Sequence, residues 1–351
     1  MPVRLTALTE LAELGFDEII DVRSPSEFAE DHLPGAINLP VLDDAERSRV
    51  GTIYKQQSPF LARKVGAALL ARNAARHLEG PLADKSGGWR PLVYCWRGGQ
   101  RSGGLATILG HIGWRVDTVA GGYQSWRRLV VRTLYDSPVP AAVMVLDGNT
   151  GTAKTEVLHL LCQRGVQVID LEGLANHRGS LFGARPGGQP SQKAFEGRLA
   201  LQIADLDPSR PVLVEAESSK IGNCRIPPQL WKAMLAAPRI CIEAPRAARA
   251  RYLAQAYADL VADPVELGQL IDKLRPLQPG RFIERWHALA NAGEFVALAD
   301  ELMEHHYDPR YAKQRSLTEA RPPAVVQASD LATADLAELA DRLLLEVTGG
   351  R

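Results

Sequence analysis

The sequence predicts an α/β protein of two domains, each built on a parallel sheet. A chain of 351 residues is long enough to bury two separate hydrophobic cores. Apolar strand patterns alternate with helical patterns up to about residue 130, and the same alternation starts again after residue 140. Residues 131–140 end in a polar stretch with prolines and are the predicted linker. The predicted domains are therefore residues 1–130 and 141–351.

Each element of the two sheets follows from a short apolar run. In the first domain, strands are predicted at residues 18–22 and 91–94, and a helix at residues 104–112. In the second domain, strands are predicted at residues 142–146, 166–170, 212–215, 239–243 and 324–327. Helical patterns fill the gaps, and the longest helical segment is predicted at about residues 245–305. A last helix is predicted over about residues 334–347, with Thr333 as its N-cap.

Charge and cysteine content exclude several classes of protein. The chain has 41 Lys and Arg against 41 Asp and Glu, whereas a dedicated nucleic-acid-binding protein is usually basic, so any RNA contact must use local patches. The four cysteines, at positions 95, 162, 224 and 241, form no CxxC pair and no zinc spacing, and we predict no metal-ligating residues. Because such cysteines fit a reducing compartment, and no apolar run reaches membrane-spanning length, we expect a cytoplasmic protein with no membrane partner.

Cys95 is the strongest candidate for a catalytic residue. It follows the predicted strand at residues 91–94 and precedes a loop made of Trp96, Arg97, Gly98, Gly99 and, after one glutamine, Arg101. The N–H groups of such a tight loop can converge on the sulfur, and a helix N-terminus with nearby guanidinium groups favours the thiolate. We therefore predict that Cys95 attacks a substrate or carries an extra chalcogen atom as an anion. The alternative is a buried structural thiol.

A phosphate-binding loop is predicted at the start of the second domain. A buried-strand pattern leads into a glycine-rich loop and then into a helix that starts near Lys154, which is the order that a P-loop requires. The predicted phosphate-binding residues are Gly148, Asn149, Thr150, Gly151, Thr152, Lys154 and Thr155. Loop N–H groups and the helix N-terminus would surround a phosphate, Lys154 adds a positive charge, and Thr155 can hold a metal or a phosphate oxygen. Ala153 stands where the usual pattern has glycine, which argues against orthodox ATP hydrolysis. The alternative is a plain strand-to-helix turn with a surface lysine.

Three further groups of polar residues are candidate contacts for a phosphate-bearing substrate or for RNA. A polar loop after the second strand contains His177, Arg178 and Ser180. The carboxyl end of the predicted strand at residues 212–215, where open parallel sheets bind ligands, carries Glu215, Glu217 and Lys220. The start of the long helical segment carries Arg246, Arg249 and Arg251. The respective alternatives are a surface histidine, a salt-bridged strand end and a solvated helix face.

Residues 5–128 resemble the rhodanese (sulfurtransferase) domain. The resemblance rests on the cysteine loop, on the DVR motif at residues 21–23, on HLPGA at residues 32–36 and on GGY at residues 121–123. DVR and HLPGA are mainly fold markers in that family, so no catalytic role is assigned to them. The order of motifs along the whole chain is similar to that of the tRNA 2-selenouridine synthase family. The matching segments are residues 50–56, 95–99, 148–155, 176–180, 214–218, 220–222 and 307–309.

This resemblance implies a rhodanese-like domain followed by a P-loop NTPase-like α/β domain with a helical insertion. It implies that 2-thiouridine at the wobble position of tRNAs for Lys, Glu and Gln is S-geranylated with geranyl diphosphate and then converted to 2-selenouridine with selenophosphate. No tightly bound cofactor is expected, and Mg²⁺ is the ion that would accompany the diphosphate. Whether Cys95 forms a covalent perselenide or only orients the selenium donor stays open. Trp96, Tyr123 and Trp126 are candidates for stacking on the bases of an anticodon loop.

Two other classes of protein remain open at this point. One is a P-loop kinase or ATPase fused to an ordinary persulfide sulfurtransferase, which Ala153 disfavours. The other is a binding module whose two loops only hold anions. The complete loop around Cys95 disfavours that class, because a pure binding module does not need a thiol there.

Overall fold

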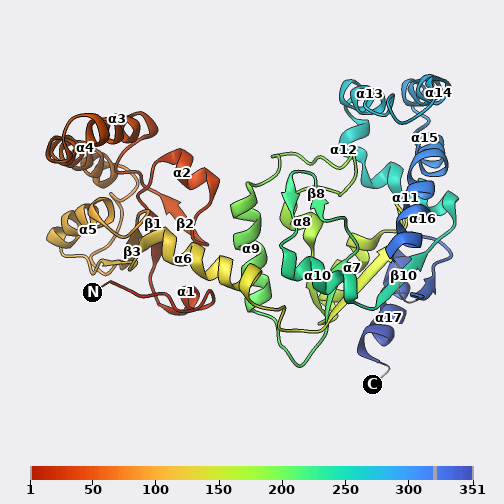
Figure 1. The fold of residues 1–351 in the computed structure, drawn as a ribbon, viewed down its shortest axis with the longest axis horizontal. Coiled ribbons are helices and arrows are strands. Elements are labelled where there is room, and N and C mark those ends of the chain that lie inside the picture. Colours follow the sequence, from red (N-terminus) through yellow and green to blue (C-terminus); the bar gives the residue numbers. More distant parts are fainter. Residues whose placement is uncertain (1, 319–321, 350–351) are drawn as a thin grey trace. The chain divides into compact units, whose positions relative to one another are not determined.

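Two parallel sheets organise the chain, one in each of two structural units (Figure 1). The structure is a computed structural model, and it describes residues 2–318 and 322–349. Unit 1 comprises Met1–Ser137 and Pro190–Asp205, and unit 2 comprises Pro138–Gln189 and Leu206–Arg351. In the described part of the chain, none of the helices combines the length and the apolar character needed to cross a membrane.

Unit 1 is built on a four-stranded parallel sheet in the order β2-β1-β3-β4. Its strands are β1 (Glu18–Asp21), β2 (Ala36–Asn38), β3 (Pro91–Tyr94) and β4 (Asp117–Thr118). Its helices from the first part of the chain are α1 (Glu10–Glu13), α2 (Pro25–Glu30), α3 (Asp44–Gln56), α4 (Pro59–Glu79), α5 (Gln100–Ile112) and α6 (Gly122–Val131), which continues into the π-helical turn η1 (Arg132–Asp136). β3 is buried along its whole length, as expected for an inner strand of a parallel sheet. The two predicted strands are confirmed, but α5 begins four residues earlier than predicted because Gly99 is its N-cap.

One helix of unit 1 comes from the second half of the sequence. The helix α9 (Gln192–Ala204) packs against α6 and η1, and it buries Phe195, Leu199 and Ile203. Glu196 on the same helix is 2% exposed, accepts a hydrogen bond of 2.7 Å from the Tyr135 hydroxyl and pairs with Arg127. A buried carboxylate is stable only when it is paired, so this contact depends on residues from both segments.

Unit 2 is built on a five-stranded parallel sheet in the order β11-β10-β5-β7-β6. Its strands are β5 (Val143–Gly148), β6 (Gln167–Ile169), β7 (Val212–Glu215), β10 (Arg239–Glu243) and β11 (Ala324–Gln327), and a small hairpin is formed by β8 (Lys220–Ile221) and β9 (Cys224–Arg225). All five strands predicted for this sheet are confirmed. The helices around the sheet are α7 (Lys154–Gln163), α8 (Leu171–Ala175), α10 (Pro228–Ala236), α16 (Asp308–Thr318) and α17 (Thr333–Thr348). Thr333 is already helical and the N-cap is Ala332, which has extended backbone, so the prediction of Thr333 as N-cap is wrong.

The predicted helical segment at about residues 245–305 is confirmed as a bundle of short helices. It contains α11 (Arg246–Ala256), α12 (Ala258–Val261), α13 (Pro264–Asp272), α14 (Gly280–Asn291) and α15 (Phe295–Leu302), followed by the π-helical turn η2 (Met303–Tyr307). Pro264 at the start of α13, Pro279 before α14 and Gly293 before α15 interrupt the helical pattern, whereas α11 passes into α12 at Tyr257 without proline or glycine. The helices share a hydrophobic cluster around Trp286, which is fully buried together with Ile271 and Ile283.

Candidate active sites

Cys95 lies directly after β3, where the chain turns into the loop that precedes α5. The sulfur accepts a hydrogen bond of 3.3 Å from the backbone N–H of Gly99 and lies 3.2 Å from the Ser102 hydroxyl oxygen. The Ser102 hydroxyl also lies 3.3 Å from the Gly99 carbonyl oxygen. Because a hydroxyl has one proton, Ser102 can donate to the Gly99 carbonyl when Cys95 is a thiol and to the sulfur when it is a thiolate.

Two glycines allow the loop to close around the sulfur. Gly98 has a φ of +66°, and a Cβ there would lie 2.7 Å from the Val119 carbonyl oxygen. Gly122 has a φ of +57°, and a Cβ there would overlap the Cys95 carbonyl oxygen. Any other residue at these positions would be strained in backbone conformation and would also push the loop away from the sheet. The glycines seen in the sequence therefore shape the cradle and do not contact substrate through side chains.

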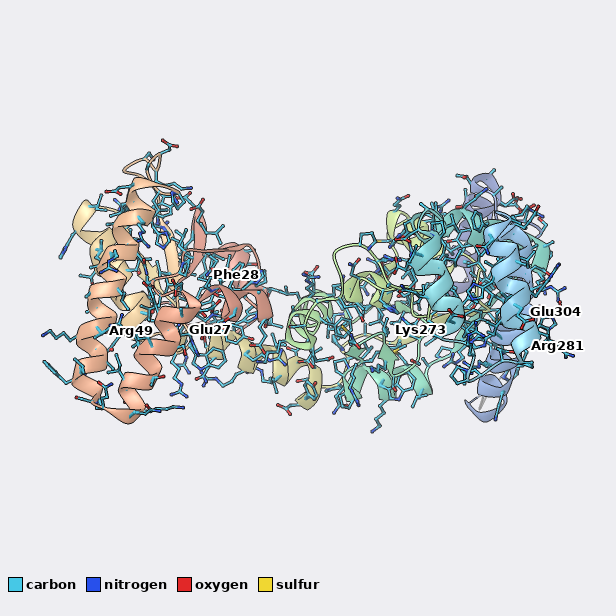
Figure 2. The ribbon with its side chains drawn as sticks, turned by 90° about the horizontal axis from the view of Figure 1, so that it is seen from above. Glu27, Phe28, Arg49, Lys273, Arg281 and Glu304 are labelled. Carbon is cyan, nitrogen blue, oxygen red and sulfur yellow. The ribbon has the colours of Figure 1, made fainter. Side chains whose placement is uncertain are left out.

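The environment of Cys95 favours the thiolate. Burial raises the pKa of the Cys95 thiol, but hydrogen bonds from Ser102 and Gly99 and the charge of Arg101 outweigh burial, so the pKa is lowered overall. Arg101 shares its charge with Glu27, to which it donates at 2.8 Å. Glu27, labelled in Figure 2, also accepts from Arg47 at 2.9 Å. Arg97 is exposed, so its guanidinium can meet an anionic substrate at the loop.

The aromatic residues near the loop belong mostly to the core. Tyr123 and Trp126 are each 1% exposed, which rules them out as platforms for RNA bases and corrects that expectation. Trp96 is partly exposed and stacks on Tyr123 with ring centroids 5.2 Å apart. The guanidinium of Arg23 lies 4.2 Å from the Tyr123 ring centroid and is bound by Asp21, so the DVR motif ties the first strand to this loop.

The predicted phosphate loop connects β5 to α7 in unit 2. The Lys154 ammonium donates to the Gly148 carbonyl at 2.9 Å and lies 3.5 Å from the Asn149 carbonyl, so it is held inside the loop. Burial lowers the pKa of Lys154, but the surrounding Tyr311, Glu172, Glu217 and Asp147 raise it more strongly, so the ammonium stays charged. This arrangement of strand, loop, helix and lysine matches the predicted P-loop.

A polar cavity of about 400 Å³ opens beside this loop, and we call it the phosphate pocket. It brings together several residues predicted from the sequence, namely Thr150, Gly151, Thr152, Lys154, Thr155, Arg178, Ser180 and Glu217. It also contains residues that sequence reasoning missed, namely Glu172, Arg185, Tyr252, Tyr257 and Tyr311. Three cationic side chains, Lys154, Arg178 and Arg185, therefore face one cavity at a helix N-terminus, which is the chemistry that binds a phosphorylated ligand.

Two carboxyl groups moderate the positive charge of the phosphate pocket. Glu172 accepts from the Thr155 hydroxyl at 3.1 Å and shares a hydrogen bond with Glu217. Burial, followed by the charge of Glu172, raises the pKa of Glu217 to about 8. Glu217 therefore holds a proton at neutral pH and adds little repulsion against a bound anion. Glu215, the other acid predicted here besides Glu217, is 1% exposed and lies outside the pocket lining, where it accepts from the Glu172 N–H at 2.6 Å.

The other residues predicted to contact substrate or RNA either support the loops, are paired with other side chains or lie away from the phosphate pocket. His177 accepts a hydrogen bond from the Gly179 N–H at 3.1 Å and shapes the loop without lining the phosphate pocket. Arg178 lines the pocket, but it also pairs with Asp259 at 2.8 Å and lies over the Tyr257 ring. Lys220 is exposed on β8, away from the pocket lining. Gly148 and Asn149 contribute their carbonyl groups to Lys154 and do not line the cavity.

The three arginines of α11 do not form one basic patch. Arg249 is 6% exposed and binds both carboxylate oxygens of Asp308, at 3.0 and 2.7 Å. It also donates to the Thr150 carbonyl at 3.1 Å, and Asp308 accepts from the Asn149 side chain at 3.2 Å. Arg249 therefore supports the phosphate loop from behind and is not presented to RNA. Arg246 and Arg251 lie near the surface in ion pairs with Asp300 and Asp330, respectively, at 2.8 and 2.7 Å.

Two known protein families match the parts of the chain that carry the Cys95 loop and the phosphate loop. Residues 5–129 match the rhodanese-like domain, and residues 141–269 match the tRNA 2-selenouridine synthase AAA domain. The chain therefore joins a thiol domain of rhodanese type to an AAA-type domain with a phosphate loop. The tRNA 2-selenouridine synthase of Aeromonas salmonicida (strain A449) is 38% identical over 259 residues, which are 72% of this chain and 69% of that protein. The tRNA 2-selenouridine synthase of Pseudomonas syringae pv. tomato is 34% identical, and the match covers 86% of this chain and 90% of that protein. The tRNA 2-selenouridine synthase of Bordetella bronchiseptica is also 34% identical, and the match covers 88% of this chain and 91% of that protein.

The chain belongs to the tRNA 2-selenouridine synthase family, and the resemblance found in the sequence is confirmed.

Proposed function

We propose that this protein converts 2-thiouridine at the wobble position of tRNA to 2-selenouridine in two steps, with selenophosphate and geranyl diphosphate as co-substrates. The tRNAs are those for Lys, Glu and Gln, and the protein works in the cytoplasm. The observation that carries the proposal is the combination, in one chain of this family, of a Cys95 thiol whose pKa is lowered and a cationic phosphate pocket around Lys154. The first suits the selenium chemistry, and the second suits a diphosphate leaving group.

The phosphate pocket serves the first step. The sulfur of 2-thiouridine attacks C1 of geranyl diphosphate, a C–S bond forms, the C1–O bond breaks, and inorganic diphosphate leaves with the electron pair. The N3 proton of the base is released to solvent. Lys154, Arg178 and Arg185 line the pocket in which the diphosphate gains negative charge, and charge-assisted hydrogen bonds are strongest to the most charged form of a ligand.

Mg²⁺ fits the donors in this pocket. Glu172 and Thr155 supply hard oxygen ligands at the base of the pocket, and the crowded carboxyl groups, whose pKa values are raised by burial, gain from a nearby cation. Among the residues that the structure describes, no cluster of three or more His, Cys, Asp or Glu side chains is arranged to hold a metal. Mg²⁺ would therefore bind together with the diphosphate, whose leaving charge it would neutralise.

The Cys95 cradle serves the second step. The selenium of selenophosphate attacks C2 of the S-geranylated base, the C2–S bond breaks, and geranylthiolate leaves and takes up a proton. Water then cleaves the P–Se bond and yields phosphate and 2-selenouridine. The loop N–H group of Gly99 and the guanidinium of Arg97 would orient the anionic selenium donor beside Cys95.

A staged reaction tests the proposal. Thiolated tRNA is incubated with the protein and geranyl diphosphate, selenophosphate is then added, and the digested nucleosides are identified by mass spectrometry after each stage. We expect S-geranyl-2-thiouridine after the first stage and 2-selenouridine after the second. Lys154→Ala should block the first stage, and Cys95→Ala should stop the reaction at the geranylated nucleoside. Absence of any geranylated nucleoside with the unaltered protein would refute the two-step route.

A further inference from the structure

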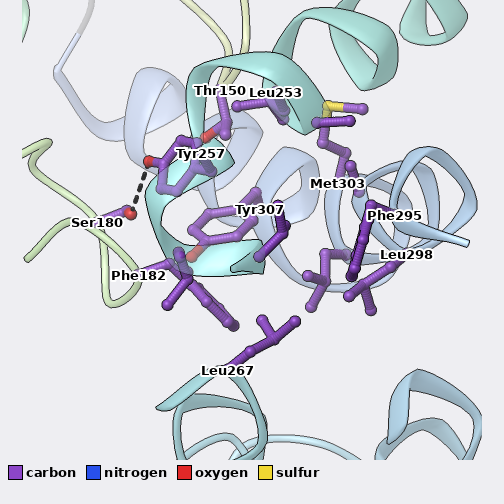
Figure 3. A pocket seen from close by; sticks show the side chains of 15 residues that line it. Thr150, Ser180, Phe182, Leu253, Tyr257, Leu267, Phe295, Leu298, Met303 and Tyr307 are labelled. Atoms are coloured by element: carbon purple, nitrogen blue, oxygen red, sulfur yellow. Dashed lines mark hydrogen bonds between the residues drawn. The ribbon is translucent and has the colours of Figure 1, made fainter. Parts of the chain in front are cut away.

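We propose that an apolar chamber next to the phosphate pocket binds the hydrocarbon chain of the allylic diphosphate, and that Leu267 at its far wall limits the length of that chain. The proposal rests on the proposed function for the identity of the ligand. The chamber encloses about 70 Å³ and is partly open to solvent, and Figure 3 shows the side chains that line it.

The chamber and the phosphate pocket meet each other. Four residues, Thr150, Ser180, Leu253 and Tyr257, line both cavities. Thr150 belongs to the phosphate loop, so a diphosphate held there would have its organic end at the mouth of the chamber. The Tyr257 hydroxyl lies 3.3 Å from the Ser180 hydroxyl and forms part of the polar rim between the two cavities (Figure 3).

Beyond this rim the chamber is hydrophobic. Its walls come from the helical bundle, and the large apolar side chains that line it include Leu267 on α13, Phe295, Leu298 and Leu302 on α15, and Met303 on η2. Leu267 lies across the chamber from Thr150 and Leu253 (Figure 3). The Tyr307 hydroxyl is the polar side-chain group that the walls add beyond the rim, in the lining that the structure describes. A nucleotide base would need several hydrogen-bond partners, whereas a branched hydrocarbon chain needs none.

The enclosed volume of the chamber sets how much of the hydrocarbon chain is buried. An apolar cavity of about 150 Å³ holds benzene, which is about 25 Å³ for each carbon, so a ten-carbon chain needs about 250 Å³. The enclosed space of the chamber is about 70 Å³. At about 25 Å³ for each carbon it holds roughly three carbon atoms of such a chain, and the rest of the chain would lie in the open part of the chamber. Truncating Leu267 removes three carbon atoms from the far wall, which adds space at the end where a longer chain would extend.

The first test measures binding without tRNA. The affinities of the full-length protein for geranyl diphosphate and for inorganic diphosphate are compared by calorimetry. If only a third of the ten chain carbons are buried, at about 0.8 kcal/mol each, geranyl diphosphate should bind about 100-fold more tightly than inorganic diphosphate. Ala299→Phe should fill the chamber and remove this preference without changing the affinity for inorganic diphosphate. Val296→Phe is the matched control, because Val296 lies on the same helix and is 45% exposed. Equal affinity of the unaltered protein for the two ligands would overturn the proposal.

The second test concerns chain length. Leu267→Ala should raise the ratio of kcat/KM for farnesyl over geranyl diphosphate by at least tenfold, and Val265→Ala, at a 69% exposed position of the same helix, should leave the ratio unchanged. The same ratio can be measured by binding, so the test does not depend on transfer to tRNA. An unaltered ratio in Leu267→Ala would remove Leu267 as the limiting residue. Selective binding of geranyl diphosphate without any transfer to tRNA would leave the chamber assigned and refute the proposed function instead.

Discussion

The ion pair between Arg249 and Asp308 predicts an unequal response to substitution of its two members. Asp308→Ala would leave the Arg249 guanidinium, whose side chain is 7% exposed, without its counter-charge. Breaking a buried pair in this way costs about 3–5 kcal/mol. We expect a cost near the lower end, about 3 kcal/mol, because the Asp308 side chain is 25% exposed and water can partly reach the site. Arg249→Met should cost less, about 1–2 kcal/mol, because Asp308 can then be hydrated and still accepts from Asn149.

Urea unfolding followed by tryptophan fluorescence measures both losses. Trp231 and Trp286 report on unit 2, and the transition of unit 1, which contains neither substitution, is the internal control. Arg246→Ala is the matched surface variant, since Arg246 is 42% exposed and its pairs with Asp300 and Glu304 should contribute less than about 1 kcal/mol. If Asp308→Ala and Arg246→Ala lower the free energy of unfolding equally, Arg249 is not a buried charge that depends on Asp308.

Three further outcomes are expected. Cys95→Ala should abolish formation of 2-selenouridine and leave geranylation in place, and selenouridine made at the parental rate would rule out a role for the thiol. Lys154→Ala should weaken diphosphate binding by about 1.5–3 kcal/mol, measured by calorimetry, because it removes the loop cation; an unchanged affinity would exclude this loop as the site. Diphosphate binding without metal should weaken as the pH rises above about 8, because Glu217, with its pKa of about 8, then loses its proton and repels the ligand. Glu217→Gln should remove this loss of affinity. If the loss persists in Glu217→Gln, another titrating group causes it.

The local motifs could be predicted from the sequence because each is encoded within a few residues. The Cys95 loop and the phosphate loop are backbone structures in which glycines, a strand end and a helix start follow one another directly. The contacts that complete the sites are not local. Arg249 and Asp308 are 59 positions apart, and Asn149 and Asp308 are 159 positions apart. No sequence pattern indicates such pairs, and Arg249 therefore looked like one of three exposed arginines.

Other features were missed although weak signals were present. Arg185 lies in the same glycine-rich stretch as Arg178, five residues beyond Ser180. Tyr311 lies in a stretch rich in histidine and tyrosine at residues 305–311, and it lines the phosphate pocket. The apolar chamber could not be located, because its walls are ordinary hydrophobic residues of several helices and only their packing leaves a space.

Ala153 shows how the structure changes the meaning of a departure from the usual motif. Its φ of 57° and ψ of 30° are the left-handed conformation that normally calls for glycine, at a cost of about 1–2 kcal/mol for another residue. Its methyl group is 4% exposed and belongs to the same hydrophobic cluster as Val157 and Ala248, where burial contributes about 0.8 kcal/mol. The reduced entropy of the unfolded chain relative to glycine contributes about 0.4–1 kcal/mol more. The opposing effects nearly cancel, so alanine can keep the backbone of a glycine loop, and the sequence difference gives no physical reason to expect a weakened diphosphate site.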